Sequence, residues 1–182
     1  RCFWLIMKNI FILSFIFCLI SCNSNKNCIE KYLIEEENLS EKKVILFKNK
    51  STFTDAINDF IPKRINQNPT YDELKFKDEL VKKYSEDKDE VWEKNDFKKV
   101  NFIIFDFDSI QTIKNDIIIN QKINYVFSLS KPYFFNKNKN VFFRVKKYHF
   151  GKYRNPIKND VVIMEKNNGK WFVKKINANT DL

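Results

Sequence analysis

Residues 161–173 read VVIMEKNNGKWFV, and this stretch decides the fold that the sequence predicts. Apolar residues at 161–164 and 171–173 flank a polar segment that contains Asn168 and Gly169. Both residues of an Asn-Gly pair accept a positive φ, which a tight turn between antiparallel strands requires. The stretch therefore predicts a closing β-hairpin.

Earlier segments extend this pattern toward the N-terminus. Tyr125, Phe127 and Leu129 alternate with other residues, as do Val141, Phe143 and Val145, and such alternation is typical of strands. Residues 100–107 are apolar on both faces, which favours a central strand. We therefore expect residues 97–182 to be mainly β, as an antiparallel meander that ends in the hairpin.

Residues 28–96 have helical spacing instead. Ser51 precedes apolar residues at helical intervals over 53–61, and Thr70 and Glu73 have the spacing of a capping box. Residues 44–47 form a brief strand candidate, residues 29–38 could form a short helix, and another is expected around 90–92. The prediction is a single α+β domain over residues 28–182.

The N-terminal segment has the layout of a secretory signal peptide. Lys8 and Asn9 precede an apolar run over 10–20, which is shorter than the ~20 residues that span a bilayer as a helix. We expect residues 1–21 to be a cleaved leader, with 1–6 upstream of the true start at Met7. The alternative is an uncleaved transmembrane anchor.

The end of this leader, Leu19-Ile20-Ser21-Cys22, resembles a bacterial lipobox. The resemblance implies that the Cys22 thiol receives diacylglycerol, that cleavage precedes it and that the new amino group is acylated. Residues 22–27 would then form a polar, lipidated tether. Asn23 is not an inner-membrane retention signal of the Asp type, so the resemblance implies the periplasmic side of the outer membrane in a two-membrane envelope.

The cysteine and histidine content limits the chemistry of the mature domain. Cys28 is its only other thiol, and His149 is the only histidine of the chain. A lone cysteine forms no internal disulfide, and a single histidine cannot build a multi-histidine metal site. We therefore predict no metal and no cofactor.

Basic charge is concentrated in the C-terminal third. Residues 121–182 contain 14 Lys and Arg against 3 Asp and Glu, whereas residues 22–120 contain 17 against 20. Export argues against nucleic acid as a partner. Two interpretations remain open: binding to an anionic envelope surface or acidic partner, or solvated strand faces on which lysine protects the sheet.

Residues 102–110, FIIFDFDSI, resemble the first motif of haloacid-dehalogenase-type phosphatases. In that family the first Asp attacks phosphorus and the second is the acid/base, with Mg²⁺ bound nearby, so the resemblance implies these roles for Asp106 and Asp108. Ser109 and Ile110 depart from the family's usual Gly-Thr pair. The other interpretation is a strand end with two solvated aspartates.

Residues 127–176 resemble a module of uncharacterised bacterial lipoproteins. It consists of an SxPxF motif, which is Ser130 to Phe134 here, a polar turn, a strand and a closing KxGKW-type hairpin. The last hairpin is also similar to that of nuclear-transport-factor-2-like α+β domains. The overall expectation is a lipid-anchored envelope protein, a binding or structural module without catalysis; the alternative is a phosphatase-like hydrolase.

Overall fold

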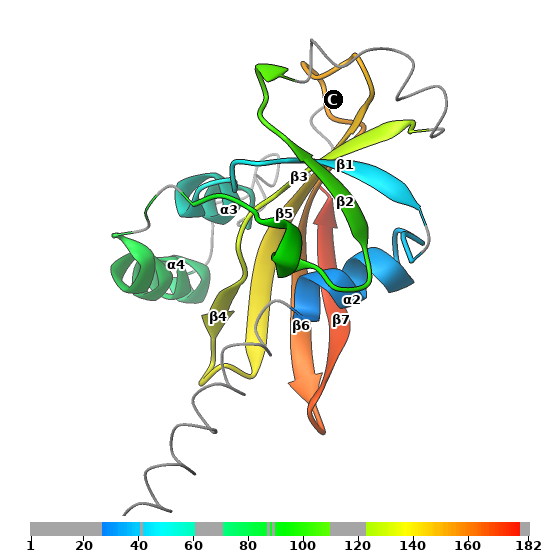
Figure 1. Cartoon of the computed structure of the whole chain (residues 1–182). Coiled ribbons are helices and arrows are strands. Elements are labelled where there is room, and N and C mark those ends of the chain that lie inside the picture. The colour runs from blue at the N-terminus through cyan, green and yellow to red at the C-terminus, as the bar shows by residue number, and fades with distance from the viewer. Residues whose placement is uncertain are drawn as a thin grey trace, which may run out of the picture.

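The computed structural model describes residues 27–40, 42–60, 71–86, 88, 90–109 and 123–178. These residues form both helices and a sheet, so the predicted α+β class is confirmed (Figure 1). The predicted leader and Cys22 lie outside the described residues. The elements in chain order are α2 Asn27–Glu35, β1 Lys43–Phe47, α3 Phe53–Phe60, α4 Tyr71–Tyr84, the 3-10 helix η1 Lys94–Asp96, β2 Asn101–Phe105, β3 Tyr125–Leu129, β4 Tyr133–Phe135, β5 Asn140–His149, β6 Lys158–Asn167 and β7 Lys170–Ala178.

The sheet is mixed, which corrects the prediction of an entirely antiparallel meander. Its strand order is β2-β1-β3-β5-β6-β7, with β4 paired to β5. The pairs from β3 to β7 are antiparallel as predicted, but β1 is parallel to both β2 and β3. Ile45 of β1 lies between Ile103 and Val126, which are far away in the sequence. Periodicity indicates which face a residue occupies and not which strand lies beside it.

Strand β2 ends the sheet, whereas its apolar sequence predicted a central position. Its two faces are apolar because each is covered by other parts of the chain. Phe102 packs in the same cluster as Phe97, and Ile103 packs against the cluster of Ile45 and Tyr148 on the other face. The first half of the chain, though mainly helical, thus supplies the inner strand β1.

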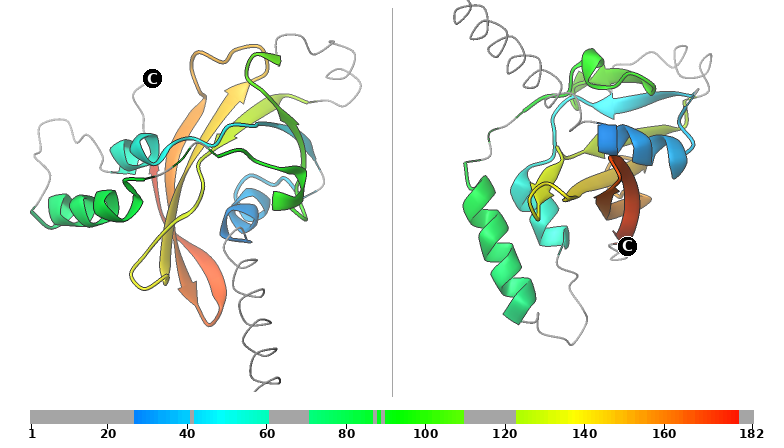
Figure 2. Two further views of the ribbon diagram at one scale, coloured as in Figure 1. Left: turned by 60° about the vertical axis from the view of Figure 1, so that its left-hand side comes forward. Right: turned by 90° about the horizontal axis from the view of Figure 1, so that it is seen from below.

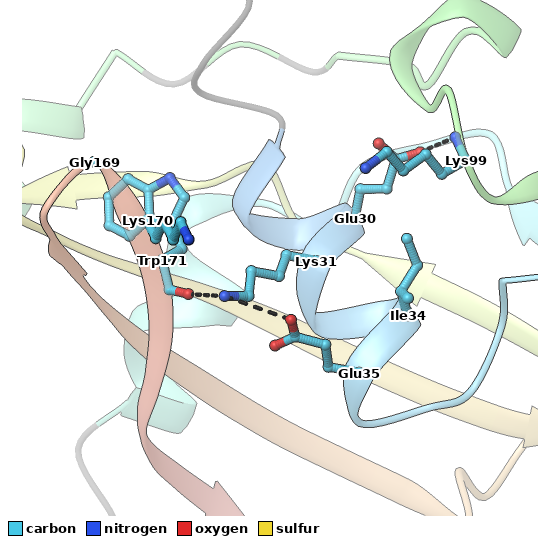
Figure 3. A pocket seen from close by; sticks show the side chains of 8 residues that line it. All are labelled: Glu30, Lys31, Ile34, Glu35, Lys99, Gly169, Lys170 and Trp171. Carbon is cyan, nitrogen blue, oxygen red and sulfur yellow. Dashed lines mark hydrogen bonds and ion pairs between the residues drawn. The ribbon is translucent and has the colours of Figure 1, made fainter.

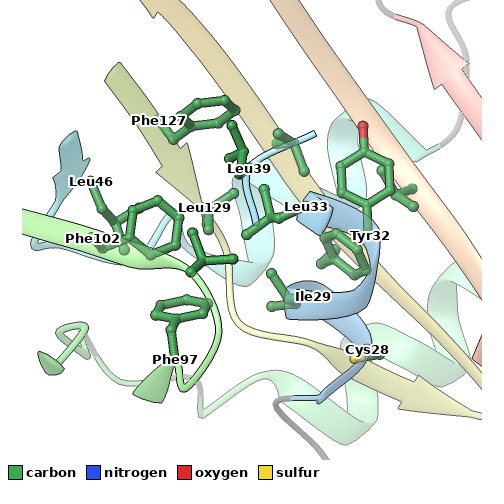
Figure 4. Close-up of a cluster of buried hydrophobic side chains, with 14 of the residues drawn as sticks. Cys28, Ile29, Tyr32, Leu33, Leu39, Leu46, Phe97, Phe102, Phe127 and Leu129 are labelled. Atoms are coloured by element: carbon green, nitrogen blue, oxygen red, sulfur yellow. The ribbon is translucent and has the colours of Figure 1, made fainter. Parts of the chain in front are cut away.

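The helices cover opposite faces of the sheet (Figure 2). Phe143 and Val162 belong to the cluster beneath α2, whereas Phe142 and Val161 belong to the cluster beneath α3 and α4. Neighbouring residues of a strand point to opposite faces, so β5 and β6 are buried on both sides. The larger cluster joins Ile29 and Leu33 of α2 to strands β1, β2 and β3 (Figure 4).

Several helix boundaries differ from the sequence predictions. Thr52 caps α3, since its Oγ1 accepts a hydrogen bond from the Asp55 N–H at 3.2 Å, while Ser51 forms a β-bridge with Ser130. The expected helix around 90–92 is absent from the described residues there; Val91 instead forms a bridge with Asn49. Thr70 of the predicted capping box lies outside the described residues, as does Ile110. Asn27, predicted to end the tether, begins α2.

The closing hairpin is confirmed. Asn167 of β6 pairs with Lys170 of β7, and the two residues between them, Asn168 and Gly169, have φ values of +47° and +78°.

Among the described helices, none combines the length and the hydropathy needed to cross a membrane.

Candidate functional site

The basic residues of the C-terminal third do not form one solvated surface. Under the interpretation of solvated strand faces, Arg144 of β5 would be exposed, but it is buried, because α3 covers that face. Its Nε donates to Asn159 Oδ1 at 3.0 Å, and its Nη1 lies 3.9 Å from Asp55 Oδ1. Lys147 and Lys158 also turn inward, toward α2. The interpretation as solvated faces is therefore wrong for these three residues.

A compact ionic cluster lies just beyond the C-terminal end of α2. The Glu37 side chain is only 4% exposed and lies 2.6 Å from Lys158 Nζ and 2.9 Å from Lys147 Nζ. Lys158 Nζ also donates to the Tyr32 hydroxyl at 3.0 Å and lies 3.2 Å from Asp160 Oδ2. The cluster balances two ammonium groups with two carboxyl groups.

Burial and pairing shift the pKa values of this cluster in opposite directions. Burial alone would raise the pKa of Glu37, but hydrogen bonds from Lys158 and Lys147 outweigh it and lower that pKa. Burial alone would lower the pKa of Lys158, but hydrogen bonds to Glu37 and Tyr32 raise it. Burial raises the pKa of Tyr32 to about 12 and also raises the pKa of Asp160. Glu37 and Lys158 therefore both stay charged around neutral pH.

Strongly shifted pKa values often mark functional sites, but ion-pair networks produce them too. The geometry favours a structural role here, because every hydrogen bond of the Glu37 carboxylate goes to a lysine or to Tyr32. The cluster ties the chain after α2 to strands β5 and β6.

Glu30 anchors the other end of α2. Its Oε1 accepts backbone N–H bonds from Lys98 at 2.6 Å, from Val100 at 3.1 Å and from Lys99. The residue is buried at 5% exposure, so these three donors replace water around its charge. The helix is thus held by one carboxylate at each end.

A shallow hollow of about 280 Å³ lies between α2 and the start of β7 (Figure 3). Its lining combines apolar Ile34 and Trp171 with Lys99 and Lys170, and it also includes Glu30 and Glu35. Lys31 lies within it, donates to the Trp171 carbonyl and pairs with Glu35 at 3.4 Å. An amphiphile with an acidic group is the kind of ligand that this combination suits.

Beside the hollow, two polar turns meet at one end of the sheet. Lys137 and Lys139 lie in the β4–β5 turn, whereas Lys166 near the end of β6 and Lys170 at the start of β7 flank the β6–β7 turn. The Lys166 N–H donates to the Lys139 carbonyl at 2.7 Å, so the turns are in direct contact. We call these four lysines the basic tip. Residues 136–140 and 166–170 contain no acidic residue.

The sequence also singled out Asp106 and Asp108, which follow β2 and are exposed. Asp106 Oδ1 lies 3.6 Å from Lys48 Nζ. Phe107 between them packs 6.2 Å, ring to ring, from Tyr153 of the β5–β6 loop, so the pair lies away from the basic tip. Among the described residues, no three His, Cys, Asp or Glu side chains are grouped as metal ligands.

The two remaining singled-out residues lie apart from the hollow. Cys28 is fully buried, and burial raises the pKa of its thiol to about 12. His149 is exposed at the end of β5 and packs against Tyr125, with ring centroids 5.5 Å apart.

Sequence reasoning missed Glu30, Glu37 and the contact between the two turns. The first two lie within and just after a helix rich in glutamate, so nothing in the local pattern separates them from exposed Glu35 and Glu36. A signal for the turns did exist, because both segments are rich in lysine and asparagine and contain no acidic residue.

Comparison of the chain with protein-family models, with curated proteins and with solved structures finds no match.

Proposed function

We propose that this protein is a lipid-anchored module of the bacterial envelope that binds an anionic ligand through its tethered end and carries out no catalysis. In a two-membrane envelope we place it at the periplasmic side of the outer membrane. The observation that carries the proposal is the Leu19-Ile20-Ser21-Cys22 lipobox, which stands five residues before the first described residue of the domain, Asn27.

The described structure supports a binding role at this end. The lining of the hollow combines Ile34 and Trp171 with Lys99 and Lys170, and the hollow lies along α2, which follows the predicted tether directly. The charged groups of Glu37, Lys147 and Lys158, by contrast, pair with one another and hold the end of α2 against the sheet.

The anchor is tested by feeding cells a fatty acid that can be tagged after lysis. The intact chain should incorporate the tag, whereas Cys22→Ala should incorporate none and accumulate as the longer precursor. Cys18→Ala, a cysteine change inside the leader, is the matched control and should be labelled like the parent. Labelling of Cys22→Ala would refute the assignment of the lipid to Cys22.

A further inference from the structure

We propose that the basic tip rests on an anionic phospholipid surface and so fixes the orientation of the domain on its membrane. The inference deepens the proposed function and rests on the lipid anchor at Cys22. It names the ligand class as the headgroups of the bilayer that holds the lipid.

The segment between Cys22 and the start of α2 is short, so the domain stays close to the lipid. Asn27 is five positions after Cys22, and an extended chain covers at most ~3.5 Å per position, so α2 begins within about 18 Å of the lipidated residue. The first turns of α2 lie beside the β6–β7 turn, since Lys31 bonds the Trp171 carbonyl and Glu30 and Gly169 line one hollow. The tether therefore joins the domain at the start of α2, which lies toward the end of the sheet that carries the basic tip.

The two ends of the sheet differ in charge. Lys137, Lys139 and Lys170 are exposed and make no ion pair with another described residue. The one acidic neighbour of the β6–β7 turn, Glu165, lies 3.1 Å from Lys174. The opposite end mixes basic residues with acidic ones: Lys152 and Arg154 in the β5–β6 loop, and exposed Asp106 and Asp108 after β2.

The fold holds the basic tip in place. Asn136, Lys137 and Asn138 all have positive φ, and Lys139 is joined to the neighbouring turn through its carbonyl. The two hairpins pair through β5 and β6, and their turns lie at the same end of the sheet (Figure 1). Each lysine close to an anionic bilayer strengthens binding about fivefold.

Single cysteine probes on the lipidated full-length protein can test the orientation. Asn167→Cys places a fluorophore at the tip and Asn155→Cys places one in the β5–β6 loop; both positions are exposed asparagines. The ten residues of β6 hold the two positions about 30 Å apart. Buried Cys28, whose pKa is raised to about 12, should not compete for the label.

The probe proteins are inserted into vesicles of phosphatidylglycerol that contain lipids with a nitroxide quencher at the headgroup, and into matched phosphatidylcholine vesicles. We expect quenching at position 167 to be severalfold stronger than at 155 in the anionic vesicles. The difference should shrink in neutral vesicles. It should also shrink in ~1 M salt, where screening limits electrostatic attraction to about 3 Å.

Charge variants separate the tip from net charge. Changing Lys137, Lys139 and Lys170 to Gln should abolish the difference between probes, whereas the same loss of charge at Lys82, Lys152 and Arg154 should leave it intact. Equal quenching at both positions in a protein that is lipidated would overturn the orientation and leave the anchor standing. A protein that never enters the vesicles would instead show failure of the anchor.

Discussion

Gly169 illustrates how one backbone angle fixes the closing hairpin. Its φ is +78°, and a Cβ built there would meet nothing within 4 Å, so substitution costs conformational energy without a clash. Gly169→Val should lower the free energy of unfolding by on the order of 1 kcal/mol or more, because a β-branched side chain resists positive φ. Gly169→Asn should cost less, since asparagine tolerates this region. Equal denaturation midpoints for the parent and Gly169→Val would show that the turn does not require a positive φ at this position.

Glu37 carries a second prediction at this scale. Glu37→Gln leaves two lysines facing a neutral amide. Breaking a fully buried pair costs ~3–5 kcal/mol, but these lysine side chains remain 19% and 29% exposed, so we expect a loss on the order of 2 kcal/mol. Glu36→Gln, at an exposed neighbour, should change little. A loss of the same size in both variants, measured by chemical denaturation, would contradict the assigned role.

The pH dependence of that loss has a definite sign. The folded-state pKa of Glu37 lies below its ordinary value of 4.5, so its charged form stabilises the fold above that value and the contribution disappears as pH falls below it. Glu90 acts in the same direction, because Lys131 and Lys50 lower its pKa to about 2. The difference in stability between the parent and Glu37→Gln should therefore shrink from pH 6 toward pH 3. A difference that grows on acidification would contradict this.

At the scale of elements, the position of α2 depends on its two carboxylate ties. Glu30→Ala removes the acceptor of three backbone N–H groups, and leaving buried donors unpaired costs ~1–3 kcal/mol. Glu30→Gln keeps an acceptor oxygen and should lose less. Glu35→Ala is the control, because that half-exposed side chain makes one surface pair worth under ~1 kcal/mol. The order of the three denaturation midpoints tests whether Glu30 holds α2 in position. A loss of stability in Glu35→Ala as large as that in Glu30→Ala would refute this role.

The elements themselves were largely predictable, because they depend on local periodicity and turn chemistry. The Asn168-Gly169 hairpin, the alternation of 125–129 and 141–145 and the short strand at 44–47 all appear where expected. The pairing of β1 with β2 and β3 was not predictable. It depends on contacts between segments some 55 and 80 residues apart, and periodicity within a segment carries no information about its partner.

The basic charge of the candidate site could be predicted from the sequence, but the positions of its residues in the fold could not. Composition located the basic excess in the C-terminal third, yet Arg144 is buried, and Lys147 and Lys158 are partly buried against the Glu37 carboxylate. A lysine on a strand is outward-facing only if nothing covers that face, and the covering helices α2 and α3 come from the other half of the chain. The lysines that are exposed at the tip lie in the β4–β5 turn or at the first residue of β7.

For the whole molecule, the central claim is that Cys22 is lipidated. Trypsin cuts after Lys26 and should release residues 22–26, CNSNK, from the purified protein. Mass spectrometry of this peptide measures the state of the N-terminus directly. We predict that it begins at Cys22 and carries a diacylglyceryl group and an acyl chain. An unmodified Cys22, or a peptide continuous with the leader, would contradict the central claim.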